Sequence, residues 1–478
     1  MKRQLSAPGW TVALAATVAT VAAVSIGRSP AHVGHAASDQ DSGRYGEAIV
    51  LRGEQLGGLQ GRQLEAIIAI DDQGRRLLLQ VDERDAAGAF VAVEDGILDA
   101  NDELVLMAED AGGDWPADGI IPLVSGQRIK VTDPLGAADR WIFVGVDDPA
   151  RPFGPTHPLP EAAIRYVTAS SRIAGRSYAM DFAQPSTDGF IGPKGMRFTE
   201  AGPNLVDRLK IRFTVRTFLG ADTYTEEDIA ANADVRAAEG PPPRIGPLRI
   251  VLDAQGQNLA LAQRLTISRG TYEDVALPLG ATLEDLRMAL DLSPAALGAT
   301  YRDARGPAVL TIDEKPDAPA SRPLPLWREL TFTEGRLLLL SRPSSAASSA
   351  RQTFDDGGKA PANDTGDKRL IGQIGVVADS MPSLGQADFP GELVFLPPGN
   401  SLSAERLAAQ AAAPLRVEVL DWSPLGPASA TPQPTVVSAT PTAVEATPTV
   451  GAATATSMTT ATVGANHGRL WLPWLQRP

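Results

Sequence analysis

Residues 64–107 have the sequence LEAIIAIDDQGRRLLLQVDERDAAGAFVAVEDGILDANDELVLM. Three short apolar runs, at 64–70, 77–81 and 103–107, lie between segments rich in Gly, Asp and Arg. Apolar runs of this length, bounded by turn residues, are typical of strands in antiparallel sheets. The pattern therefore predicts a β-sandwich or barrel in this part of the chain.

The same pattern continues along most of the chain. We expect a first β-sandwich domain with an acidic loop at about 40–150, closed by a Pro-rich linker at 151–160 that holds four Pro. Alternating apolar and polar segments, such as 211–216, then predict a larger β-sandwich domain over 161–427. The predicted fold class is all-β, with two β-sandwich-like domains and a few short helices.

Three short helices are expected inside the second domain. A capping-box sequence predicts a helix over 229–238, and leucines spaced for one helical face predict another over 282–290. Ser403 begins an Ala-rich helix that Pro414 ends. The polar segment 344–368, rich in Gly, Ser and Asp, is expected to be a mobile loop.

The N-terminus has the features of an export signal. Lys2 and Arg3 precede the uncharged segment 10–26, and small residues surround Ala36. This arrangement predicts a signal peptide over 1–36, cleaved after Ala36. The alternative is a retained membrane anchor, because the uncharged segment is at the lower limit for crossing a bilayer. Both alternatives place the remaining chain outside the cytoplasm.

The C-terminus has two distinct parts. Residues 428–466 are almost entirely Ala, Thr, Pro, Val, Ser and Gly, with Glu445 as their one charge. Frequent Pro and few bulky apolar groups predict a disordered stalk, which at ~3.1 Å per residue could reach about 120 Å. Residues 467–478 then place Leu, Trp and Pro between two Arg, which predicts a sorting-like tail or a contact with a lipid interface.

Several of these segments resemble those of known exported proteins. The markers are VDERD…VEDGILDANDELVLMAEDAGG at 81–113, VDRLKIRF at 206–213 and GPLRIV at 246–251. They resemble a loosely defined group of exported bacterial proteins that has no assigned function. The stalk and short Leu-Pro aromatic tail are similar to the ends of many exported proteins of filamentous bacteria. The resemblance implies an exported β protein and brings no catalytic residue with it.

Most of the negative charge lies in one place. The net charge is −14, and residues 82–118 contribute −11 of it through twelve Asp and Glu against Arg84. Ca²⁺ prefers carboxylate and amide oxygens at alternating loop positions. Leu104 stands where an EF-hand loop needs Gly, and no bidentate Glu follows at the expected distance, which argues against an EF-hand. A less regular Ca²⁺ site remains a candidate, and the alternative is a set of solvated acidic turns. The candidate ligands are Asp95, Asp99, Asn101 and Asp102.

The composition excludes several kinds of active site. The chain has no Cys, which excludes disulfides, thiol nucleophiles and thiolate metal sites. Beyond the export segment only His157 and His467 remain, in the linker and the tail, which argues against a His-based zinc site or catalytic triad. A pI near 4.9 argues against a general nucleic-acid binder. Glycoside hydrolysis by a pair of carboxylates needs neither His nor Cys and is not excluded.

We therefore expect an exported or cell-surface, non-enzymatic β-sandwich protein with a binding or envelope-structural role. Its expected partners are the cell envelope or an extracellular polysaccharide, with membrane contact through the N-terminal segment or the C-terminal tail. The alternative is an extracellular carbohydrate-active enzyme, either a glycoside hydrolase or a polysaccharide lyase.

Overall fold

The computed structural model describes most of the chain between its two ends. The described residues are 44–91, 95–115, 123–136, 138–147, 160–184, 192–231, 244–252, 258–267, 282–317, 322–323, 325–341, 350–357, 360, 364–381 and 391–422. The predicted signal peptide, stalk and tail lie outside these residues, as does the linker except for Pro160. No described helix is long and apolar enough to cross a membrane.

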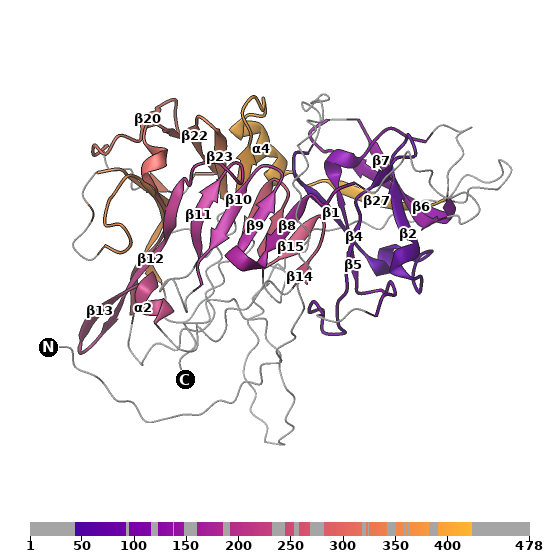
Figure 1. Cartoon of the computed structure of the whole chain (residues 1–478), viewed down its shortest axis with the longest axis horizontal. Coiled ribbons are helices and arrows are strands. Elements are labelled where there is room, and N and C mark those ends of the chain that lie inside the picture. The colour runs from indigo at the N-terminus through magenta and orange to yellow at the C-terminus, as the bar shows by residue number, and fades with distance from the viewer. Residues whose placement is uncertain are drawn as a thin grey trace, which may run out of the picture.

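The predicted all-β fold class is confirmed. The described strands pair antiparallel in five sheets, and two of these sheets form a first unit (Figure 1). One sheet of the first unit has the order β1 (Ala48–Arg52), β5 (Glu103–Met107), β4 (Gln80–Asp82). The other has the order β27 (Arg416–Trp422), β6 (Leu123–Thr132), β7 (Arg140–Asp147), β2 (Ile67–Ile70), β3 (Arg76–Leu77).

The two sheets of the first unit face each other across one core. Leu51 and Leu104 come from the smaller sheet, and Ile129 and Ile142 from the larger one, and all four are fully buried. Each strand turns every second side chain to this core, so the apolar runs of the sequence become one face of a sandwich.

The last described strand returns to the first unit. β27 pairs with β6 along its whole length, from Arg416 opposite Thr132 to Trp422 opposite Gly126. In Figure 1 this orange strand lies among the purple strands of the first unit. The sequence assigned residues 415–420 to the second domain, because alternation predicts a strand and does not predict its partner.

Three further sheets make up the second unit. The first is β11 (Pro193–Arg197), β10 (Ala179–Phe182), β9 (Arg172–Gly175), β8 (Ile164–Val167). The second is β13 (Gly220–Thr225), β12 (Val206–Thr217), β18 (Thr282–Leu292), β25 (Gln373–Met381), β24 (Ala350–Asp355), β21 (Arg322–Pro323). The third is β14 (Arg244–Ile245), β15 (Arg249–Val251), β16 (Asn258–Leu261), β17 (Arg264–Ile267), β26 (Gly391–Leu396), β23 (Gly335–Ser341), β22 (Trp327–Phe332), β19 (Thr300–Asp303), β20 (Leu310–Thr311).

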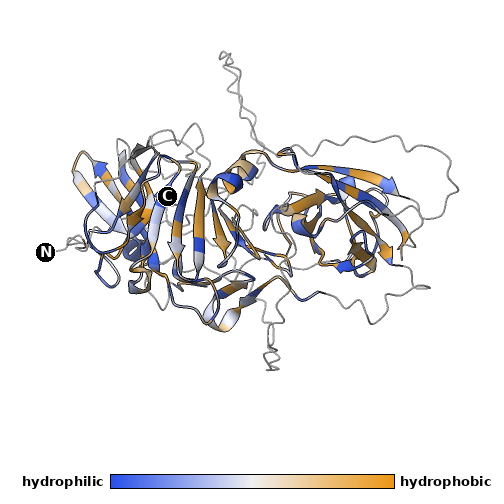
Figure 2. Ribbon diagram, turned by 90° about the horizontal axis from the view of Figure 1, so that it is seen from above, coloured by the Kyte–Doolittle hydropathy of each residue, from blue (hydrophilic) through white to orange (hydrophobic). Residues whose placement is uncertain are grey.

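These three sheets share the main core of the second unit. Met180 of the first sheet, Leu292 of the second and Phe395 of the third belong to one buried cluster. Phe395 also stacks on Tyr178, with the ring centroids 4.3 Å apart. Figure 2 shows hydrophobic residues alternating with hydrophilic ones along the strands, as this half-buried arrangement requires.

Helix α4 (Ala404–Ala412) covers the other face of the nine-stranded sheet. Its Leu407 packs with Leu338 and Val394, and all three are fully buried. The side chain of Ser403 accepts a hydrogen bond from the backbone N–H of Arg406, as an N-cap residue should. The predicted helix between Ser403 and Pro414 is therefore confirmed.

Two other predictions from local sequence are wrong. Residues 282–292 form strand β18 and not a helix, because β12 and β25 pair with it on both sides. Tertiary pairing of this kind overrides a local helical pattern. The segment 344–368 also contains a paired strand, β24, and is not simply a loop.

The short helix α2 (Glu226–Ala230) follows β13. Thr225 and Asp228 cap it reciprocally: the Thr225 hydroxyl lies 2.8 Å from Asp228 Oδ2, and the Asp228 N–H lies 3.4 Å from that hydroxyl. Residues 232–238 of the predicted helix lie outside the described part of the chain. Short 3-10 helices connect other strands, at Gly53–Gln55, Leu64–Ala66, Ala108–Asp110, Thr168–Ser170 and Pro294–Ala296.

The two units are packed against each other. Val105 and Met107 of the first unit form a buried cluster with Leu248 and Ala262 of the second. Tyr45 extends this contact, because its hydroxyl donates a hydrogen bond of 3.0 Å to the carbonyl of Phe395. The buried core therefore continues across the contact between the two units.

Candidate functional site

The first candidate residue, Asp102, is bound to the backbone. Its side chain is buried, Oδ1 accepts a hydrogen bond of 3.0 Å from the N–H of Arg84, and Oδ2 accepts one of 2.7 Å from the N–H of Asp99. Burial raises the pKa of Asp102, and these two hydrogen bonds act in the opposite direction. Both oxygens thus shape the turn that precedes β5.

The other candidate residues have similar or more exposed positions. Asp95 Oδ1 accepts a hydrogen bond of 2.9 Å from the N–H of Ile97, and Asn101 Nδ2 donates one of 2.9 Å to the carbonyl of Asp85. Asp99 is exposed. The Asp95 contact is that of an Asx turn, and the Asn101 contact ties the loop to the segment around Asp85.

The carboxylates of Asp95, Asp99 and Asp102 do not form a compact group. Among the described residues, a group of three carboxylates whose oxygens lie within 4.8 Å of one another is instead formed by Asp207, Asp291 and Asp367. Cationic side chains stand beside that group: Arg208 Nε lies 3.3 Å from Asp207, and Lys210 Nζ lies 2.7 Å from Asp291. These side chains supply the positive charge that a metal ion would otherwise bring.

A first buried ion network joins the two units, and we call it the interface cluster. It consists of Asp82 and Glu103 from the first unit's small sheet, Arg84 beside them, and Arg244 and Arg249 from the second unit. Asp82 is fully buried and Arg249 is 2% exposed. Three guanidinium groups therefore meet two carboxylates where β4 and β5 face β14 and β15.

Arg249 is the central member of the interface cluster. Its Nε lies 2.6 Å from Asp82 Oδ2, and its Nη2 lies 2.5 Å from Glu103 Oε2. Arg244 holds the other oxygen of Asp82 at 2.9 Å, and Arg84 holds the other oxygen of Glu103 at 2.7 Å. Each carboxylate is thus bound on both sides, which compensates for its removal from water.

Neighbouring groups complete the interface cluster. The Arg84 guanidinium lies 3.9 Å from the ring centroid of Phe90, and that of Arg249 lies 5.7 Å from it. The side-chain oxygen of Gln80 accepts hydrogen bonds of 2.9 Å from the backbone N–H groups of Leu248 and Arg249. The marker segments 81–113 and 246–251 meet here and hold the two units together.

A second buried network lies within the second unit, and we call it the Lys210 cluster. It consists of Lys210 and Arg212 on β12, Asp291 on β18 and Asp364 in the segment before β25. Lys210 is 2% exposed, and the side chains of both aspartates are fully buried. The marker segment 206–213 therefore also supplies interior charges.

The geometry of the Lys210 cluster places an ammonium between two carboxylates. Lys210 Nζ lies 2.7 Å from Asp291 Oδ2 and 2.8 Å from Asp364 Oδ2. Arg212 donates to the other oxygen of Asp364. The contact with Asp291 falls outside strict hydrogen-bond geometry, although the side chains of Lys210 and Gln373 both interact with the Asp291 carboxylate. Burial raises the pKa of Asp291 to about 6, against the lowering effect of Lys210.

Helix α2 closes one side of the Lys210 cluster. The carboxylate of Glu226 is fully buried and accepts a hydrogen bond of 3.1 Å from the N–H of Ile211. The Thr365 hydroxyl donates to the other Glu226 oxygen. The face of β12 that turns away from the main core is therefore covered by α2 and by the segment around Asp364.

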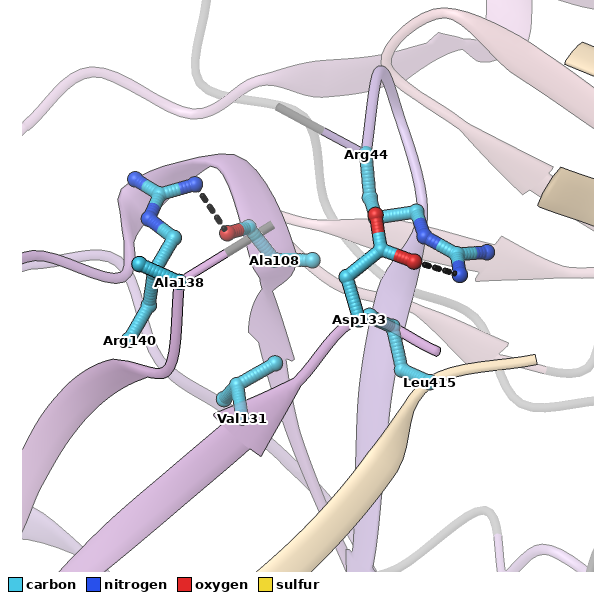
Figure 3. A pocket seen from close by; sticks show the side chains of 7 residues that line it. All are labelled: Arg44, Ala108, Val131, Asp133, Ala138, Arg140 and Leu415. Carbon is cyan, nitrogen blue, oxygen red and sulfur yellow. Dashed lines mark hydrogen bonds and ion pairs between the residues drawn. The ribbon is translucent and has the colours of Figure 1, made fainter. Parts of the chain in front are cut away.

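A small hollow lies beside β6, between the start of the described chain, the beginning of β7 and the segment that leads into β27 (Figure 3). Arg44 borders it and donates a 2.5 Å bond to Asp133, while Arg140 donates one of 3.3 Å to the carbonyl of Ala108. The space suffices for about one water molecule. It does not have the size of a substrate site.

The sequence did not predict either ion network. Arg208, Lys210 and Arg212 alternate with apolar residues, and such a pattern predicts a polar face exposed to water. The helix expected over 282–290 ends directly before Asp291, which hid the position of Asp291 opposite β12. The signal that could have been used is the alternation Leu290-Asp291-Leu292, which fits a strand and places one carboxylate on the polar face.

No protein-family model matches this chain, and no curated protein matches it significantly. The fold and its buried networks define the class to which the protein belongs. It is a mostly β protein of multiple antiparallel sheets with two short helices among its described residues.

Proposed function

We propose that the chain is an exported or cell-surface protein that acts by binding, or as a structural part of the cell envelope, and not by catalysis. The export signal, the Thr/Pro stalk and the aromatic tail of the sequence support the location. The all-β architecture is consistent with a binding or structural role, although a fold alone does not assign one.

One observation carries the non-enzymatic part of the proposal. Within the acidic stretch 82–118, the carboxylates of Asp82 and Glu103 are bound by guanidinium groups and that of Asp102 by backbone N–H groups. A glycoside hydrolase instead needs a pair of carboxylates facing a groove, about 5–9.5 Å apart, with room for sugar and water. Carboxylates that stabilise strands and turns are not available for that chemistry.

The experiment compares binding with turnover on the same material. Protein lacking residues 1–36 is mixed with isolated cell envelopes and with a panel of polysaccharides. We expect cosedimentation with envelopes or with one polysaccharide, and no release of reducing ends or unsaturated products. Saturable binding that is lost on thermal unfolding supports the proposal.

The rival function is an extracellular glycoside hydrolase or polysaccharide lyase. Robust turnover that single Asp or Glu substitutions abolish would overturn the proposal. A variant with an exposed ion pair removed, Arg165→Ala, is the matched control, because Arg165 and Glu200 are both largely exposed. Loss of turnover must exceed any change in this control to identify a catalytic carboxylate.

A further inference from the structure

The Lys210 cluster has the composition of a reactive site as well as that of an ion network. A primary amine and a carboxyl group, Lys210 and Asp291, lie in contact on neighbouring strands, with a second carboxylate, Asp364, on the same amine. The register places Lys210 opposite Ala289 and Asp291 opposite Arg208, so the two side chains are diagonal neighbours on one face.

We propose that Lys210 and Asp291 form an intramolecular amide bond between β12 and β18, with Asp364 carrying the proton. The reaction joins Lys210 Nζ to Asp291 Cγ and expels one water molecule. No oxidant, reductant or co-reactant is needed, because the ammonium and the carboxylate together contain all the atoms of the amide and the water.

The protons balance in two transfers. The Lys210 ammonium first gives one proton to the Asp291 carboxylate, which leaves a neutral amine beside a neutral acid. Nζ then attacks Cγ, and Asp364 Oδ2 takes a second proton from Nζ and returns it to the departing hydroxyl. The Cγ–O bond breaks, water leaves, and one hydrogen remains on the amide nitrogen.

The surroundings favour each of these steps. Burial raises the pKa of Asp291 to about 6, which favours the neutral acid that the amine attacks. Arg212 holds one oxygen of Asp364 and so directs the other towards Nζ. Exclusion of water also favours an amide over its hydrolysis.

The amide bond would also provide a covalent cross-link, which the chain otherwise lacks because it has no Cys. An exported protein without Cys has no disulfide to restrict its unfolded chain. An amide between residues 210 and 291 closes a long loop covalently and would restrict the unfolded chain as a disulfide does. This inference does not depend on the proposed binding or envelope role.

Mass spectrometry of the purified full chain tests the proposal. After its N-terminus is determined, we expect an intact mass lower than the sequence mass by one water. Trypsin should release residues 209–212 joined to residues 288–302, with no cleavage after Lys210. Since Asp-Gly sequences such as Asp95-Gly96 can also lose water, the joined peptide decides the result.

Two variants assign the roles. Lys210→Arg keeps the positive charge, and its mass should equal its sequence mass. Asp364→Asn should leave Lys210 and Asp291 unlinked in folded protein, and a complete link in that variant would overturn the role of Asp364. Free peptide 288–302 as the main product from the unaltered protein would overturn the proposal itself. This last result does not require any variant to fold.

Discussion

Replacing Arg249 by Ala should destabilise the protein more than any single change on its surface. The side chain is 2% exposed and binds Asp82 at 2.6 Å and Glu103 at 2.5 Å, across the interface between the units. Its removal takes one charge-assisted bond from each buried carboxylate. Asp82 retains Arg244, and Glu103 retains Arg84, so neither carboxylate is left entirely unpaired.

The magnitude follows from these contacts. A hydrogen bond to a charged group contributes about 1.5–3 kcal/mol, and breaking a buried ion pair costs about 3–5 kcal/mol. Two such bonds are lost while two partners remain, so we expect the free energy of unfolding to fall by about 3–5 kcal/mol.

Urea unfolding followed by far-ultraviolet circular dichroism measures the effect. Arg165→Ala serves as the control, because its exposed pair with Glu200 should contribute less than about 1 kcal/mol. If Arg249→Ala unfolds within about 1 kcal/mol of the unaltered protein, the interface cluster does not hold the units together as we argue.

Three further outcomes are expected. Asp102→Ala should lower the free energy of unfolding by about 1–3 kcal/mol, equally with and without Ca²⁺, because its oxygens bind backbone N–H groups; a loss of stability seen only with Ca²⁺ would contradict this. Burial raises the pKa of Asp110 from its ordinary 3.8 to about 6, so its folded form binds a proton more tightly and stability falls as pH rises from about 4 to about 7. In Asp110→Asn the melting temperature should therefore fall less between about pH 4 and about pH 7 than in the unaltered protein. The same pH profile in both proteins would contradict this role of Asp110. Ser403→Ala should cost about 1 kcal/mol in urea through loss of the α4 cap, and Ser403→Asp should not.

The sequence predicted the strands better than their partners. Runs such as 64–70 and 103–107 predicted the correct fold class, because short apolar segments between turn residues are typical of strands. The pairing of β27 with β6 joins residues almost three hundred positions apart, at Val417 and Val131 for example. Local patterns contain no information on such a pairing, so the return of the chain to the first unit could not be predicted.

Strand β18 shows how a local pattern misleads. Leucines at 283, 286 and 290 fit a helical face, but Asp285 has a φ of +51° and the pairing with β12 shifts register beside it. An irregularity of this kind changes the phase of alternation within a strand. The leucine spacing therefore resembles a helical period although the segment is extended.

The candidate Ca²⁺ ligands illustrate a related limit. Asp and Asn are favoured both in cation loops and in tight turns, and the sequence alone does not separate the two. In the structure Asp102 and Asn101 bind backbone groups, which accounts for their residue types without a ligand. The buried cations of the two ion networks, Lys210 and Arg249, lay in segments whose pattern predicted ordinary strands.

Fractionation of the native cells tests most directly the proposal that the chain acts outside the cytoplasm. The chain is quantified in the cytoplasm, the envelope and the medium, beside a cytoplasmic marker protein, and the N-terminus of the recovered chain is sequenced. We predict that it is found in the envelope or the medium and begins at Ala37. A chain that begins at Met1 and remains with the cytoplasmic marker would contradict the account.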